Sequence, residues 1–108
     1  MNPRKPTYPL ADITRLAQTE NKRIVTTDAQ SRARNSFDFD LDDIYAAIAA
    51  LKEREFYKTM PSEKNPGLFQ DVYHPRIAPQ PFPDGIEVYC KVQIDSLGRV
   101  VVIAFKPK

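Results

Sequence analysis

A strict alternation of apolar and polar residues near the C-terminus is the pattern that most restricts the fold of this chain. Its apolar members are Ile86, Val88, Cys90, Val92 and Ile94. Because successive side chains of a strand point to opposite faces, this row predicts a strand with one buried and one open face. Residues 99–106 are nearly all apolar, which predicts a partner strand covered on both faces. The intervening Ser96-Leu97-Gly98 predicts a tight hairpin, since Gly98 can take a positive φ.

Two runs in the middle of the chain combine aromatic, amide and cationic side chains in strand-like patterns. Residues 55–60 alternate, which predicts a strand with Phe56, Lys58 and Met60 on one face and Tyr57 and Thr59 on the other. Residues 68–76 predict a second strand. Proline and glycine mark residues 61–67 and 78–85 as loops.

The first half of the chain repeats its apolar residues at helical spacing instead. Helices are predicted over residues 9–20 and 28–35, with a short β-branched strand over 22–26 between them. Thr27 is expected to cap the second helix, with Gln30 reaching back to complete a capping box.

A third helix is predicted after Asp40, which is a favourable N-cap residue. Its apolar stripe comprises Leu41, Ile44, Tyr45, Ile48 and Leu51. Three helices followed by strands predict an α+β fold, in which the helices pack on one face of an antiparallel β-sheet. The 108 residues fit one domain spanning 1–108, with residues 1–8 expected to be loose.

Composition excludes several classes of protein. The longest apolar run covers residues 100–105, which is far too short to span a membrane. The basic N-terminus precedes no apolar stretch, so no secretory signal is expected. A single cysteine allows no internal disulfide, and a cytoplasmic protein is therefore predicted. The net charge of +2 permits a local basic face without requiring one.

Metal-dependent and thiol chemistry find little support in the residues. A zinc site needs about three or four nitrogen or sulfur ligands, and the chain has one histidine and one cysteine. The acidic run over 38–43 fits helix capping better than a metal cluster. Cys90 lies within the apolar row, where a thiol is inert. No metal and no cofactor are expected.

Acid–base chemistry on RNA needs neither a metal nor a cofactor, because the substrate supplies its own nucleophile in the 2′-hydroxyl. An enzyme has to accept that proton, stabilise the phosphorane and protonate the leaving 5′-oxygen. Tyrosine, lysine, arginine, glutamine and histidine are suited to these tasks, and they gather on the strand faces expected to be open.

Three runs of this chain carry a resemblance to a known family. They are F-Y-K-T-M at 56–60, F-Q-D-V-Y-H-P-R at 69–76 and V-V-I-A-F-K-P-K at the C-terminus. Together they resemble the motility quorum-sensing regulator (MqsR) toxins, small mRNA-cleaving enzymes of toxin–antitoxin pairs. The resemblance extends over residues 9–106 and is densest over 56–76. It implies a RelE-like toxin fold.

The resemblance also implies a catalytic set, which falls on Lys58, Gln70 and Tyr89. Lys58 and Gln70 lie in ungapped motif matches. Tyr89 is placed by the V-Y-x-K pattern, although the loop at 78–85 is longer than the connection usual in the family.

Individual roles follow from the chemistry of these side chains. Lys58 is expected to stabilise phosphate charge, because an unperturbed lysine pKa of about 10.4 does not suit a base. Tyr89 is expected to perform acid–base work, with Lys91 favouring its phenolate. Gln70 is expected to orient the 2′-hydroxyl or a phosphate oxygen. Further RNA contacts are predicted for Tyr57, Tyr73, His74, Arg76 and Lys91. His74 stands where related sequences commonly carry arginine, which favours RNA contact over an essential base role.

The expected function is a metal- and ribosome-independent endoribonuclease toxin that cuts single-stranded mRNA. The resemblance implies GC-containing sites, often GCU, and products with a 2′,3′-cyclic phosphate and a 5′-hydroxyl. Its partners would be the mRNA substrate and a cognate antitoxin, with no membrane and with DNA contacted only through the antitoxin. The alternatives are a non-catalytic partner-binding domain and a ribosome-dependent mRNA interferase. A duplex DNA-binding regulator is disfavoured, because no basic recognition helix is visible.

Overall fold

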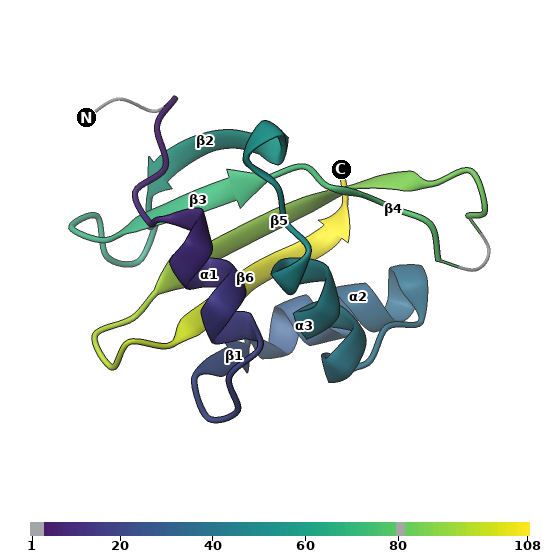
Figure 1. Cartoon of the computed structure of the whole chain (residues 1–108), viewed down its shortest axis with the longest axis horizontal. Coiled ribbons are helices and arrows are strands. Elements are labelled where there is room, and N and C mark those ends of the chain that lie inside the picture. Colours follow the sequence, from purple (N-terminus) through teal and green to yellow (C-terminus); the bar gives the residue numbers. More distant parts are fainter. Residues whose placement is uncertain (1–3, 80–81) are drawn as a thin grey trace.

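A computed structural model describes residues 4–79 and 82–108 of the chain (Figure 1). Its helices are α1 (Leu10–Ala17), α2 (Thr27–Phe37), α3 (Leu41–Ala49) and a 3₁₀ turn (Glu53–Glu55). Its strands are β1 (Arg23–Val25), β2 (Phe56–Pro61), β3 (Phe69–Tyr73), β4 (Arg76–Ile77), β5 (Ile86–Ile94) and β6 (Val100–Pro107). The predicted α+β class with three helices before the main strands is confirmed.

The strands form one mixed sheet in the order β1-β6-β5-β3-β2, with β4 paired to the beginning of β5. The pairs β2–β3, β3–β5, β4–β5 and β5–β6 are antiparallel. Strand β1 runs parallel to β6, with Ile24 opposite Val101. The expectation of a purely antiparallel sheet is therefore wrong, because the short run over 22–26 gave no indication of its partner or direction.

The core cluster combines buried residues of all three helices with residues from one face of β5 and from β6. On that face Val88, Cys90 and Val92 are fully buried, which confirms the alternating row. Phe37 at the end of α2 packs edge-on against Phe105, with ring centroids 5.8 Å apart. The helices contribute Ile13, Leu16, Ala17, Ala29, Ala33, Ile44 and Ile48 to the same buried cluster. Figure 1 shows the helices gathered toward the β6 side of the sheet, away from β2.

Strand β6 is covered on one face only, contrary to expectation. Val100, Val102 and Phe105 are buried, whereas Val101 and Ile103 remain half-buried. The opposite face of the sheet is thus open at β6. The hairpin before it forms as predicted, with Gly98 at φ 74°.

The helix boundaries depend on capping contacts that differ in part from the predicted ones. Helix α1 ends at Ala17, earlier than the predicted 9–20. Helix α2 is capped by Thr26, whose hydroxyl accepts from the Ala29 amide, rather than by Thr27. Gln30 donates to the Val25 carbonyl and completes no capping box.

The predicted cap of α3 is confirmed. The Asp40 carboxylate accepts from the Asp43 amide at 2.9 Å, and Asp43 accepts from the Asp40 amide at 3.0 Å. This reciprocal pair satisfies two backbone donors that the helix itself cannot satisfy.

The segment before α1 is fixed to the sheet and is not loose at its inner end. The amides of Thr7 and Tyr8 donate to the two oxygens of Asp71, at 3.0 and 2.9 Å. The Thr7 hydroxyl lies 2.7 Å from that of Thr59, and the Tyr8 hydroxyl donates to the Phe69 carbonyl. The prediction that residues 1–8 are loose is thus wrong for Thr7 and Tyr8. Positions 1–3 lie outside the described residues.

The loop expected over 78–85 includes positions 80 and 81, which lie outside the described residues. On either side of it, β4 and the beginning of β5 pair through Arg76–Glu87 and Ile77–Ile86 and project from the sheet (Figure 1).

Within the described part of the chain, no helix is both long and apolar enough to cross a membrane.

Candidate active site

A β-bulge at Tyr57 decides which side chains of β2 reach the open face of the sheet. Phe56 pairs with Tyr73, but the next pair is Lys58 with Val72, so Tyr57 is the extra residue. Phe56 consequently packs edge-on against Tyr73 on the core side, with ring centroids 5.5 Å apart. The predicted common face for Phe56 and Lys58 is wrong, because a bulge interrupts the period of two.

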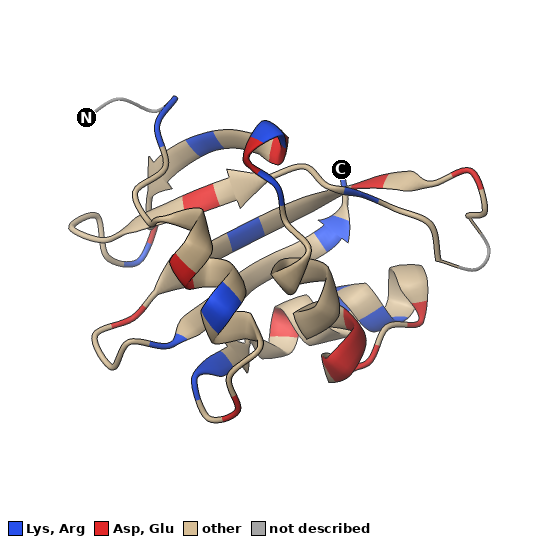
Figure 2. Ribbon diagram, viewed as in Figure 1, with Lys and Arg blue, Asp and Glu red and all other residues tan. Residues whose placement is uncertain are grey.

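Lys58, Gln70 and Tyr89 come from neighbouring strands and share this open face. Lys58 lies opposite Val72, which in turn lies opposite Lys91. Paired residues point to the same side, and alternation then assigns Gln70 and Tyr89 to that side too. Figure 2 shows lysine or arginine positions, in blue, on β2, β5 and β6, which are strands of this face.

Val72 lies at the centre of the open face but is 0 % exposed. It does not belong to the main core cluster, so the long side chains of its own face cover it. The catalytic candidates thus lie around a buried apolar residue.

Tyr89 reaches across the open face toward β2. Its hydroxyl lies 4.0 Å from the sulfur of Met60, a weak acceptor that leaves the phenol able to bind a substrate oxygen. The ammonium of Lys106 lies 5.3 Å from the centroid of the Tyr89 ring. Burial raises the pKa of Tyr89, and the nearby Tyr57 and Glu63 raise it further. The expected phenolate next to Lys91 is therefore wrong: the group is a protonated acid at neutral pH.

An aromatic array connects Lys58 with Tyr89. The Lys58 ammonium lies 5.5 Å from the Tyr57 ring centroid, within cation–π range. Tyr57 stacks on His74 with ring centroids 4.5 Å apart, and His74 lies 5.9 Å from Tyr89. Tyr57 is 55 % exposed, so one ring face of the array is open to solvent.

His74 is held within this array by its backbone and by stacking on Tyr57. Its amide donates to the Glu55 carbonyl at 2.8 Å, and its Nε2 atom is buried without a hydrogen-bond partner. Burial lowers the pKa of His74, with the cations of Lys108 and Lys58 acting in the same direction and Glu87 opposing them. A lowered pKa disfavours the charged imidazolium, and therefore favours stacking over ionic contact with phosphate.

Acidification is expected to destabilise the folded protein through His74. Its folded-state pKa lies below the unfolded value of about 6.5, so the unfolded chain binds the proton first as pH falls. The free energy of unfolding should decrease as pH falls from about 6.5 toward the depressed folded-state value. In His74→Gln this part of the pH dependence should be absent, as measured by urea unfolding over that pH range. An identical slope in the variant would contradict the assignment.

Gln70 is 6 % exposed and fixed by a neighbour on β5. Its Nε2 donates to Oε1 of Gln93 at 2.9 Å. The sequence-based set omitted Gln93, although β5 alternation places it on the same face as Tyr89 and Lys91. The polar row of β5 was the signal that could have identified it.

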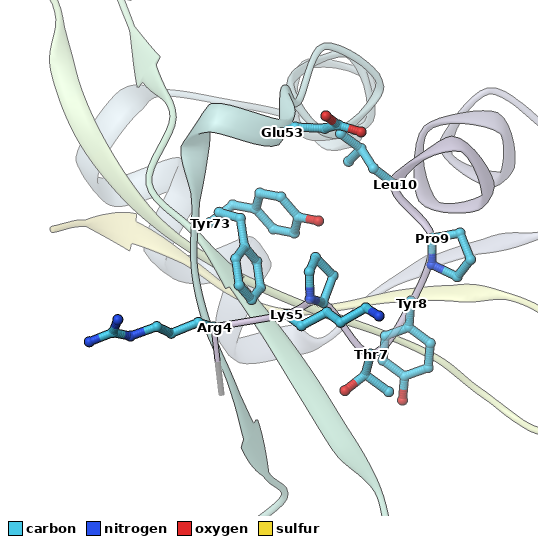
Figure 3. Close-up of a pocket in the computed structure, with 10 residues that line it drawn as sticks. Arg4, Lys5, Thr7, Tyr8, Pro9, Leu10, Glu53 and Tyr73 are labelled. Carbon is cyan, nitrogen blue, oxygen red and sulfur yellow. The ribbon is translucent and has the colours of Figure 1, made fainter. Parts of the chain in front are cut away.

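Tyr73 does not lie on the open face. It is 0 % exposed, and its hydroxyl has no hydrogen-bond partner. The N-terminal segment and Glu53 line a pocket of about 470 Å³ with Tyr73, and Figure 3 shows the Tyr73 hydroxyl pointing into it, with Glu53 and Leu10 along one edge. Alternation separates Tyr73 from Gln70, so an RNA contact through Tyr73 does not fit its position.

The remaining candidates differ in their surroundings. Lys91 lies on the open face between β3 and β6, opposite Val72 and Ala104. Arg76 lies on β4, at the projecting end of the sheet, where its guanidinium pairs with Glu87 at 3.5 Å. Lys91 is thus next to the catalytic candidates, whereas Arg76 lies on a separate two-residue strand at the end of the open face.

The described residues form no group of three or more histidine, cysteine, aspartate or glutamate side chains that could hold a metal ion. Cys90 is fully buried in the core, as its place in the apolar row predicted, and burial raises the pKa of its thiol.

Comparison with known proteins gives two matches, both over nearly the whole chain. The chain is 28% identical over 108 residues to the mRNA interferase toxin MqsR of Escherichia coli (strain K12), and the alignment covers 100% of both chains. Residues 5–107 match the family described as motility quorum-sensing regulator, toxin of MqsA. The chain therefore belongs to the motility quorum-sensing regulator family of toxins.

Proposed function

We propose that this protein is an endoribonuclease toxin that cuts single-stranded mRNA by attack of the 2′-hydroxyl on the adjacent phosphate. The observation that carries the proposal is the placement of Lys58, Gln70 and a protonated Tyr89 on one open sheet face. The family relationship and the mRNA interferase name of the Escherichia coli relative support the same reaction.

In the proposed reaction the 2′-oxygen forms a bond to phosphorus as its proton passes to solvent water at the open face, and the bond from phosphorus to the 5′-oxygen breaks. Lys58 stabilises negative charge on the non-bridging oxygens. Tyr89 gives its proton to the leaving 5′-oxygen, a role that suits an acid with a raised pKa. Gln70, held by Gln93, orients the 2′-hydroxyl or a phosphate oxygen. The products are a 2′,3′-cyclic phosphate and a 5′-hydroxyl.

The RNA strand would follow the aromatic array. Tyr57 offers an exposed ring for base stacking, backed by the stacked ring of His74. Lys91 supplies a cation next to the catalytic set, and Arg76 extends the path toward β4. Cleavage at GC-containing, GCU-like sites and a RelE-like fold belong to this proposal through the family resemblance.

The proposed partner is a cognate antitoxin, in line with the family description as toxin of MqsA. DNA would be contacted only through that antitoxin. We place the activity in the cytoplasm, where mRNA is available, and assign it no metal or other cofactor.

The test is cleavage of a synthetic single-stranded RNA containing GCU by purified protein, with excess EDTA and without ribosomes. Cutting with cyclic-phosphate ends supports the proposal. Cutting that requires added ribosomes would favour a ribosome-dependent interferase. No cutting by folded protein under either condition, with retained binding to the antitoxin, would favour a non-catalytic partner-binding domain.

A further inference from the structure

A second pocket opens on the same sheet face as the catalytic candidates. It has a volume of about 370 Å³ and lies between the β2–β3 loop and strand β5. Its lining includes Glu63, Asn65, Leu68, Gln70, Gln93 and Ile103, together with the cations Lys64 and Lys91. Gln70 belongs both to this pocket and to the proposed catalytic set, so the two sites are continuous.

The loop that forms one wall of this pocket is ordered by its own hydrogen bonds. The Ser62 amide donates to the Leu68 carbonyl at 2.9 Å, and the Leu68 amide donates to the Asn65 carbonyl at 2.9 Å. The Asn65 amide in turn donates to the Ser62 hydroxyl at 3.3 Å. A wall fixed in this way can discriminate between ligands by shape and hydrogen bonding.

The chemistry of the lining fits a nucleobase. Leu68, which is 42 % exposed, and Ile103 offer apolar surface for a planar ring. Amide groups and one carboxylate supply the hydrogen-bonding groups that read the edge of a base. Lys64 and Lys91 provide charge for the attached phosphate. A volume of this size lies within the range of small-ligand sites, roughly 300–1,000 Å³.

Glu63 connects the pocket to the reacting group. Its negative charge is close enough to Tyr89 to contribute to the raised pKa of that phenol. A base held against Glu63 and Gln93 would therefore place its own phosphate beside the proposed acid.

We propose that this pocket is the subsite that selects one nucleobase next to the scissile phosphate, with Gln93 and Glu63 as the residues that determine base preference. This inference rests on the proposed nuclease function. Gln93 has two tasks in this proposal: its Oε1 accepts from Gln70 and positions it, and its own amide NH₂ group donates to the base.

The experiment compares cleavage of short RNAs that differ only in the base on either side of the scissile bond. Gln93→Ala and Glu63→Gln are expected to change the ratio of cleavage between preferred and disfavoured bases by roughly tenfold, since one well-placed base contact discriminates by about 1–3 kcal/mol. The matched controls are Gln18→Ala and Glu20→Gln, which change exposed residues at the end of α1 and beyond it. Both controls should keep the wild-type ratio.

Binding of RNAs with a 2′-deoxy substitution at the scissile nucleotide keeps the inference testable if a variant loses activity. These oligonucleotides cannot be cut, so affinity ratios for the same base changes report recognition alone. Loss of rate without any change in either ratio would mean that Gln93 acts only on Gln70, and would overturn the inference. Wild-type protein that cuts no RNA would instead overturn the proposed function on which it rests.

Discussion

Tyr89→Phe is expected to lower the rate of RNA cleavage by about 10²–10⁴-fold, the range for loss of one positioned proton transfer. The substitution keeps the ring that lies near His74 and Lys106 and removes only the hydroxyl. Within residues 4–79 and 82–108, the hydrogen-bond acceptor of that hydroxyl is the Met60 sulfur, which is a weak one. Folding and RNA affinity should therefore change little. The measurement is single-turnover cleavage of a GCU-containing RNA under saturating protein.

The matched control for this variant is Tyr45→Phe, which removes a phenolic hydroxyl on α3. That hydroxyl donates to the Arg23 carbonyl at 3.4 Å, on the other side of the core. It should leave the cleavage rate unchanged. Tyr89→Phe protein that folds, binds RNA and cuts at the wild-type rate would remove Tyr89 from the reaction.

The pH dependence of cleavage offers a second check on the role of Tyr89. A general acid acts in its protonated form, and the raised pKa keeps Tyr89 in that form through neutral pH and beyond the ordinary tyrosine value of about 10. Loss of activity attributable to Tyr89 should therefore begin only above about pH 10. A phenolate base would give the opposite sign, with activity rising as the pH approaches the pKa.

Local patterns in the sequence account for the elements that were predicted correctly. The alternation from Ile86 to Ile94 needed no knowledge of distant residues, because a period of two is a property of the strand itself. The Asp40 cap is equally local, since its partner Asp43 lies three positions away. Lys58, Gln70 and Tyr89 were named by the family resemblance, and Lys58 reaches the open face next to the bulge at Tyr57.

The features that were missed depend on partners far away in the sequence. The parallel pairing of β1 with β6 joins Ile24 to Val101, and no local pattern specifies a strand's direction. The bulge at Tyr57 appears only once β3 is paired with β2. Thr26 replaced Thr27 as the cap, and its hydroxyl also donates to the Ile103 carbonyl on β6, a distant contact that fixes its position.

Tyr73 is a different case, because the sequence pattern itself indicates that Tyr73 and Gln70 lie on opposite faces of β3. Within β3, alternation places Gln70 and Val72 on one face and Asp71 and Tyr73 on the other. A functional assignment to both Gln70 and Tyr73 therefore conflicts with their odd spacing. The same rule along β5 places Gln93 on the open face with Tyr89 and Lys91, but the predicted functional set gave Gln93 no role.

The second prediction concerns the two hydrogen bonds between the Asp71 carboxylate and the N-terminal segment. Asp71→Asn is expected to lower the free energy of unfolding by about 2–4 kcal/mol, because it replaces two hydrogen bonds to a buried charged group worth about 1.5–3 kcal/mol each. Asp71 is 0 % exposed, and its two oxygens accept from the Thr7 and Tyr8 amides. Asparagine keeps one acceptor but directs an NH₂ group at the second amide. Chemical denaturation with the slope recorded is the measurement.

Asp12→Asn is the matched control for this prediction. Asp12 lies in the first turn of α1 and forms an exposed ion pair with Arg15 at 3.4 Å. Exposed pairs of this kind contribute about 0–1 kcal/mol, so the control should change stability far less than Asp71→Asn. Equal effects of the two substitutions would show that the buried carboxylate does not fix the N-terminal segment.

Amide hydrogen exchange separates local release of this segment from general destabilisation. In the wild type the Thr7 and Tyr8 amides should exchange slowly, because each is bonded to a fully buried carboxylate. In Asp71→Asn these two amides should lose protection first, while the β5 amides at Val88 and Val92 stay protected.

Asp71 and Gln70 are neighbours on β3 that face opposite sides, so release of the segment should also loosen β3 beneath Gln70 and reduce cleavage. Unchanged cleavage with the segment released would show that β3 holds Gln70 in place through its strand pairing alone.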